Sequence, residues 1–149
     1  MTKAQLKEEL KKAMLARDTE KTSTIRMVVS ALGYYEINKG GANYEATEED
    51  VEAVLQKEVK QRRDSIEQFK LGGRDDLVEK ETKELEMLSV FLPAQMSEDE
   101  IRSVVKETVA QTGATSQQDM GKVMGALMPK VKGKADGNIV GKIVREILT

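Results

Sequence analysis

The chain has 149 residues, a formal net charge of −2, 39% hydrophobic residues and 34% charged residues, which fits one ordinary domain or two small ones. It contains no cysteine and no histidine, so disulfides, zinc fingers, thiol nucleophiles and imidazole bases are excluded. No run approaches the roughly 18 apolar residues of a membrane span, and the N-terminal residues do not read as a secretory signal. We therefore expect a cytoplasmic protein with no membrane association.

The first part of the chain predicts two helices. Apolar residues recur at helical spacing from Lys3 to about Ala16, and Thr2 is a suitable N-cap. A second helix begins after Asp18 and ends at Gly40-Gly41, because glycine accepts the backbone angles that terminate a helix. We expect these two helices to form a hairpin.

Two further helices are predicted before the first proline. Thr47-Glu-Glu-Asp50 fits a capping box at the start of a long helix that ends at Leu71-Gly72-Gly73. The next helix starts at Asp75 or Asp76 and ends at Leu92-Pro93. Lys57–Asp64 mixes both charges at helical spacing, and we interpret it as a solvated face with weak ion pairs. The four helices, joined by short turns, predict an antiparallel bundle.

A domain boundary is predicted at Pro93, because Pro93–Ser97 resembles a linker and Ser97 opens a new capping box. The expected domains are residues 1–92 and residues 93–149. The N-terminal domain is a four-helix, bundle-like unit. With no strand pattern in the sequence, the expected fold is all-α.

Three helices are predicted after the boundary. One runs from Ser97 to Gly113, the next follows the cap candidate Ser116 and is closed by Pro129, and the last is capped by Asp136. They would form a compact three-helix domain.

Positive charge is concentrated near the C-terminus. Residues 120–145 contain six cations and one anion, a local charge of +5 in a chain of net charge −2. Such a patch suits an anionic partner. The six cations are Lys122, Lys130, Lys132, Lys134, Lys142 and Arg145.

Several features of this segment allow two interpretations. Gly121 and Gly125 lie on one side of a helix, where they favour either tight packing against the last helix or close approach by a phosphate. The lysine-rich connector 129–136 is either a phosphate-following loop or a solubilising turn, and it lacks the pattern of a nucleotide-binding loop. Met120, Met124 and Met128 recur every four residues, as a core stripe or as a partner surface.

The segments 119–137, 88–95 and 60–69 resemble the YqeY family of small bacterial proteins, and the likeness covers essentially the whole chain. That family is similar in turn to the C-terminal helical and tail region of the B subunit of the glutamine-dependent aspartyl/glutamyl-tRNA amidotransferase. The resemblance implies a four-helix domain followed by a three-helix tail. It also implies a tail that contacts tRNA, while amide transfer occurs in a separate catalytic cradle that this chain lacks.

By this resemblance we expect a non-catalytic tRNA-binding or tRNA-metabolism accessory protein in translation, with no catalytic residue, cofactor or metal. The family label of carbon-nitrogen ligase with glutamine as amido-N-donor describes the relative. An adaptor for an amidotransferase or an aminoacyl-tRNA synthetase, and an accessory with an enzymatic effect, are the alternatives. The phosphate-contacting positions implied by the resemblance are Lys122, Lys130, Lys132, Lys134 and Lys142, with Arg145 weaker, and Gly121, Gly125 and Gly133 permit close approach.

Overall fold

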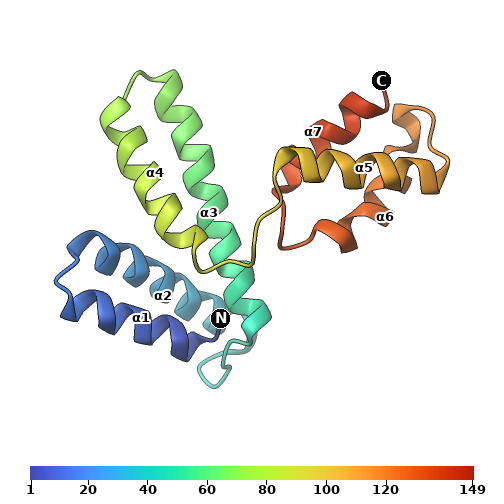
Figure 1. Cartoon of the computed structure of the whole chain (residues 1–149). Helices are drawn as coiled ribbons and strands as arrows, with labels where there is room; N and C mark the ends of the chain where they lie inside the picture. The colour runs from blue at the N-terminus through green and yellow to red at the C-terminus, as the bar shows by residue number, and fades with distance from the viewer. The chain divides into compact units, whose positions relative to one another are not determined.

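The computed structural model describes all 149 residues and is entirely helical, with seven α-helices, one short 3-10 helix and no strand (Figure 1). The prediction of an all-α fold is therefore confirmed. Contacts within the chain divide it into two compact units, Met1–Leu92 and Pro93–Thr149, and each has its own hydrophobic core. No helix combines the length and the apolar composition that crossing a lipid bilayer requires.

The first unit begins with α1 (Lys3–Leu15) and α2 (Thr19–Gly40), which pack against each other as a hairpin. Thr2 caps α1: its hydroxyl accepts a hydrogen bond from the Gln5 amide at 3.1 Å, and Gln5 accepts one from the Thr2 amide at 2.8 Å. Asp18 caps α2 by accepting from the Lys21 amide at 2.9 Å. Both predicted helix starts are confirmed, because the caps satisfy amides that have no partner within the helix.

The second hairpin of this unit consists of α3 (Glu48–Leu71) and α4 (Asp75–Ser89). In Figure 1 the two hairpins lie at an angle to each other, and α2 packs against both α3 and α4. Helix α4 ends at Ser89, earlier than predicted. Beyond it the Phe91 amide donates to the Leu88 carbonyl at 3.0 Å, so the chain tightens into a turn ahead of Pro93.

The hydrophobic core of the first unit joins all four helices. Ala13 and Leu6 come from α1, while α2, α3 and α4 each contribute aliphatic side chains that are almost fully buried. This shared core holds the two hairpins together, since burying a side chain of this size contributes about 1.5 to 3 kcal/mol. Its largest buried members are Leu6, Ile25, Val28, Leu32, Val51, Leu55 and Leu88.

Arg62 is an exception to the interpretation of Lys57–Asp64 as a solvated face with weak ion pairs. Its side chain is only 4% exposed and lies between two carboxylates, Glu58 on the same helix and Glu84 on α4. The guanidinium donates to Glu58 Oε2 at 2.8 Å and to Glu84 Oε2 at 3.2 Å. Lys60 and Asp64, by contrast, form the kind of exposed pair that was expected, at 3.2 Å.

The second unit contains α5 (Glu98–Thr112), a short 3-10 helix η1 (Gln117–Asp119), α6 (Met120–Val131) and α7 (Gly137–Ile147). The predicted caps Ser97 and Asp136 are confirmed. Ser116 begins η1 and does not begin α6 directly.

Pro129 does not close the sixth helix as predicted, because α6 continues to Val131. Proline has no amide to donate to the carbonyl four residues earlier, and its ring crowds that carbonyl. That residue is Gly125, which is exposed and accessible to water.

The core of the second unit is aliphatic and lies between α5, α6 and α7. Met120 and Met124 pack against this core, as the core interpretation of the methionine stripe predicts, whereas Met128 is exposed. The polar faces of α6 and α7 are thereby turned outward. The most deeply buried members of the core are Ile101, Val105, Val123, Leu127, Val140, Ile143 and Val144.

Candidate functional site

The six predicted cations all lie on exposed positions of the second unit, in three groups. Lys122 is in the first turn of α6 and Lys130 is in its last turn. Lys132 and Lys134 lie in the connector between α6 and α7, and two more cations, Lys142 and Arg145, lie on α7. The helical pattern places the apolar residues of α6 and α7 inward, so these basic side chains are turned toward solvent.

Lys130 differs from the other lysines because α5 holds its side chain. Its ammonium group donates to the Thr108 hydroxyl at 3.1 Å and to the Gln111 side-chain oxygen at 2.9 Å. Thr108 is fully buried, so this bond connects the end of α6 to the interior. Lys130 thus has a structural role that its sequence position did not reveal.

The charge near Lys122 is partly offset by an anion. The pKa of Asp119 lies below its usual value, mainly because the carboxylate accepts hydrogen bonds from the Thr115 and Ser116 amides, and in smaller part because Lys122 is near. Lys132, Lys134 and Lys142, in the connector and on α7, are also exposed.

Gly121 and Gly125 do not pack against α7, so the tight-packing interpretation of these glycines is wrong. A Cβ atom built on either residue would meet nothing within 4 Å. Both glycines are exposed on α6 and leave its backbone open to solvent. The other interpretation, close approach by a ligand, stays a prediction.

Gly133 has a different role, because its backbone has φ of +79°, a region that residues with a side chain seldom adopt. Its carbonyl accepts a hydrogen bond from the Gln95 side chain at 3.0 Å, and the neighbouring Lys134 carbonyl accepts one from the Met96 amide at 2.7 Å. These bonds tie the lysine-rich connector to the segment that enters α5. The connector is thus an ordered platform for Lys132 and Lys134.

The N-terminus of α7 already holds a carboxylate. Asp136 accepts a hydrogen bond from the Asn138 amide at 2.7 Å. The cap satisfies one of the free amides and neutralises part of the positive end of the helix dipole, which weakens this helix end as a phosphate site.

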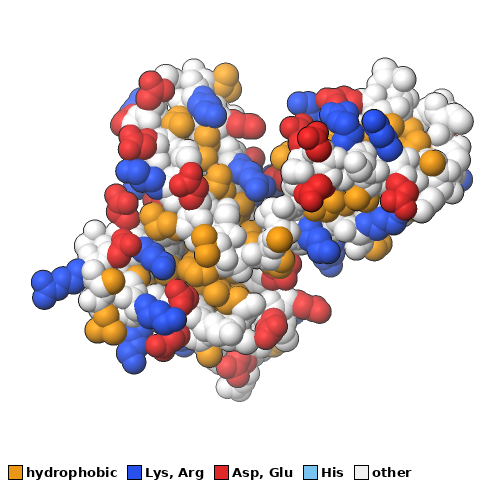
Figure 2. Space-filling model, viewed as in Figure 1, with side chains coloured by type: hydrophobic (Ala, Val, Ile, Leu, Met, Phe, Trp, Pro, Cys, Tyr) orange, Lys and Arg blue, Asp and Glu red, His pale blue; other side chains and the backbone are white.

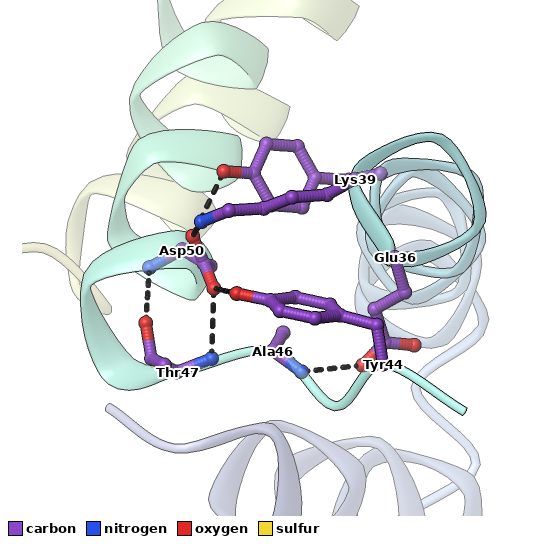
Figure 3. A network of polar contacts seen from close by, with 7 residues as sticks. Glu36, Lys39, Tyr44, Ala46, Thr47 and Asp50 are labelled. Carbon is purple, nitrogen blue, oxygen red and sulfur yellow. Dashed lines mark hydrogen bonds and ion pairs between the residues drawn. The ribbon is translucent and has the colours of Figure 1, made fainter. Parts of the chain in front are cut away.

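A second polar centre, which the sequence did not predict, surrounds Asp50 in the first unit (Figure 3). Four groups donate to this nearly buried carboxylate: Tyr35 and Lys39 to one oxygen, and Tyr44 and the Thr47 amide to the other. The Lys39 ammonium lies 5.4 Å from the ring centre of Tyr35 and 5.3 Å from that of Tyr44, a cation–π arrangement.

The electrostatics of this centre favour the charged forms. Hydrogen bonds from Lys39, from Tyr44 and from the Thr47 amide hold the pKa of Asp50 well below its ordinary value. Asp50 in turn raises the pKa of Lys39 and of Tyr44. A carboxylate with four donors is a poor general base, so the arrangement serves to join α2, the following loop and the start of α3.

A neighbouring ion pair completes the same junction. Glu36, on α2, accepts from Lys3 of α1 at 2.7 and 2.8 Å and from the Ala46 amide at 2.8 Å. The bond from Lys3 is the main reason that the pKa of Glu36 is lowered. Of this whole network, the sequence revealed only the capping box of Thr47 and Asp50. No group of three or more carboxylates is placed to hold a metal ion.

The family model described as Yqey-like protein matches residues 3–148, nearly the whole chain. The chain belongs to the YqeY family. Several curated relatives have the name "Altered inheritance of mitochondria protein 41, mitochondrial". The relative from Clavispora lusitaniae is 41% identical over 99 residues, which are 65% of this chain and 56% of that protein. The relative from Eremothecium gossypii is 38% identical over 91 residues, which are 61% of this chain and 49% of that protein. The relative from Kluyveromyces lactis is 42% identical over 92 residues, which are 61% of this chain and 48% of that protein.

This YqeY-family chain therefore spans about half the length of the curated relatives it matches. The relatives' names also contradict the prediction of a cytoplasmic protein, because they place those proteins in mitochondria. That prediction is wrong. Composition and helical pattern do not record a compartment.

Proposed function

We propose that this protein is a non-catalytic accessory of tRNA metabolism that binds tRNA through the exposed lysines of its second unit. The observation that carries the proposal is the ordered connector between α6 and α7. It presents Lys132 and Lys134 on a backbone held by Gln95 and Met96, and Lys142 is exposed on α7, the helix that follows. The mitochondrial names of the relatives support a mitochondrial location for this activity.

The chemistry of these exposed lysines favours recognition of the RNA backbone over recognition of the bases. Lysine ammonium groups are mobile point charges that contact phosphates without distinguishing sequence. The second unit contains no tyrosine, tryptophan or phenylalanine on which a base could stack. Recognition would thus depend on the shape of the folded RNA and on its charge.

The test is binding of fluorescently labelled bulk tRNA to the full-length protein at several salt concentrations, measured by anisotropy. Each phosphate contact contributes about 0.7 to 0.9 to the slope of log affinity against log salt. A variant with Lys122, Lys132, Lys134 and Lys142 changed to alanine should lose roughly 3 from the magnitude of that slope if each lysine contacts one phosphate. Lys130 is left in place because α5 uses it.

The matched control changes four exposed lysines of the first unit, Lys7, Lys11, Lys57 and Lys70, to alanine. This control has the same net charge as the test variant, so a general charge effect would weaken both equally. Equal affinity of the test variant and the wild type would refute the proposal, and so would equal binding of duplex DNA of matched charge.

We propose as a second candidate function that the protein is an adaptor for an amidotransferase or an aminoacyl-tRNA synthetase. The observation that favours it is a groove with exposed apolar side chains in the first unit. A complex that depends on this groove and survives nuclease treatment would support the adaptor function, whereas loss of the complex after nuclease would count against it.

A further inference from the structure

A wide groove runs along α2 in the first unit, with walls from the end of α1 and the middle of α3. Its volume is about 860 Å³. Three side chains in it are unusually exposed for their type, Met14 at 50%, Met27 at 49% and Tyr34 at 70%. Figure 2 shows hydrophobic side chains gathered between the two hairpins of this unit.

The groove is long enough for a helix. Ser23, Met27, Ser30 and Tyr34 line it from α2 at spacings of three and four residues. At 1.5 Å per residue these positions extend over about 16 Å, or three helical turns. Small serines alternating with larger apolar side chains leave room for the side chains of a second helix. Methionine adapts its shape to different partners, and exposed tyrosine is typical of binding surfaces.

The charged groups in the groove are predominantly basic. Arg17 and Arg26 are both exposed, and neither forms an ion pair within the chain. The side-chain contact of Arg26 is with the Met14 sulfur, at 3.9 Å. The one carboxylate in the lining, Glu58, is already paired with Arg62 at 2.8 Å. The groove thus offers two uncompensated positive charges beside an apolar floor.

The backbone at Arg17 sets the position of this arginine at the end of α1. Its φ is +56°, and it is the one residue other than glycine with positive φ in the structure. Glycine would adopt this conformation without strain, so an arginine here incurs a conformational cost. This conformation closes α1, because the Arg17 amide donates to the Met14 carbonyl at 3.1 Å and the Asp18 amide donates to the Ala13 carbonyl at 3.0 Å.

We propose that this groove binds an amphipathic helix of a partner protein, with an apolar stripe on Met14, Met27 and Tyr34 and with acidic residues facing Arg17 and Arg26. A nucleic acid fits less well. The first unit has sixteen cations and nineteen anions, a net charge of −3. A second cavity, of about 450 Å³, shares Thr19, Ser23 and Met27 with the groove, and its lining has five carboxylates and two lysines. This excess of negative charge would repel a polyanion that extended along α2 beyond the groove.

The experiment uses the full-length protein and two labelled synthetic peptides of 18 residues. Both have leucines at helical spacing, and one has glutamates on its flanks where the other has lysines. In fluorescence anisotropy the wild-type protein should bind the glutamate peptide at least tenfold more tightly than the lysine peptide. Reversal of both charges, Arg17→Glu with Arg26→Glu, should invert this preference, because the charges then match the lysine peptide.

Two further variants separate binding from folding. Arg17→Gly relieves the strained backbone, so it should preserve or raise the thermal stability while weakening binding of the glutamate peptide severalfold. A merely structural arginine would not produce this combination. Lys70→Glu, an exposed charge reversal outside both cavities, should leave the peptide preference unchanged.

The proposal is overturned if neither peptide binds, or if the charge-reversed protein keeps the wild-type preference. It is also overturned if light scattering shows a dimer that Tyr34→Ala dissociates, because a second copy would then occupy the groove. Competition by single-stranded RNA with the same dependence on Arg17 would assign the groove to nucleic acid and overturn it as well. The charge reversal lies in the first unit, so tRNA binding by the lysines of the second unit should persist in every case.

Discussion

Replacing Arg62 with methionine should destabilise the first unit strongly, because it removes the cation that joins α3 to α4. Methionine fills much of the space of the arginine stem but leaves Glu58 and Glu84 without their partner. Removing one member of a buried ion pair costs about 3 to 5 kcal/mol. The two carboxylates keep 12% and 14% of their surface exposed and can turn toward water, so the lower end of that range applies, about 3 kcal/mol.

The assay follows urea unfolding by tyrosine fluorescence. Tyr34, Tyr35 and Tyr44 are the only tyrosines, all three lie in the first unit, and the chain has no tryptophan, so this signal reports on that unit alone. With a denaturant slope of about 1.5 kcal/mol per molar urea, the transition midpoint should fall by about 2 M. Circular dichroism reports on both units, and it should show that the unfolding transition of the second unit is unchanged.

Two variants test the physical reason. Lys60→Met breaks the exposed pair with Asp64 on the same helix and should shift the midpoint by less than about 0.4 M, since such pairs contribute at most about 0.5 kcal/mol. Changing Glu58 and Glu84 to glutamine in the Arg62→Met background should recover much of the loss, because no uncompensated buried charge remains. The reasoning is refuted if Arg62→Met shifts the midpoint no more than Lys60→Met does.

Two further predictions concern acid stability and glycine. The pKa values of Asp50 and Glu36 are lowered in the folded protein, so both carboxylates contribute to the free energy of unfolding. This contribution is complete above about pH 4 to 5, and it is lost as the pH falls toward the pKa values of the folded state. Tyrosine fluorescence should therefore show the first unit weakening on acidification, and Asp50→Asn should flatten this dependence; an equally steep acid limb in the variant would contradict it. In the second unit, Gly133→Ala should lower stability by about 1 to 2 kcal/mol because of its positive φ, whereas Gly125→Ala should raise it by about 0.5 to 1 kcal/mol because its Cβ meets open space. Unfolding followed by circular dichroism measures the stability of both variants. Equal stability changes of the same sign would argue against these roles of Gly133 and Gly125.

The sequence by itself determined the helices and most of their ends. Thr2, Thr47, Ser97 and Asp136 were predicted as caps, and Asp18 was predicted to precede the second helix. Each of the five accepts a backbone amide hydrogen bond at the expected helix start. Such bonds join residues only two or three positions apart, so their geometry is encoded locally. The end of α6 was predicted less well, because the helix continues past Pro129 to Val131, which is buried in the core of the second unit.

The tertiary structure alone decided which charged residues are structural and which are available to a partner. Lys130 and Lys132 look alike in the sequence, but only Lys130 reaches Thr108 and Gln111, nineteen or more residues away. Arg62 is buried because Glu84 lies opposite it on α4, and the Asp50 network depends on α2 meeting α3. The groove beside Arg17 likewise exists only where helices distant in sequence meet. These partners are set by packing between helices, and the pattern within any one helix does not record them.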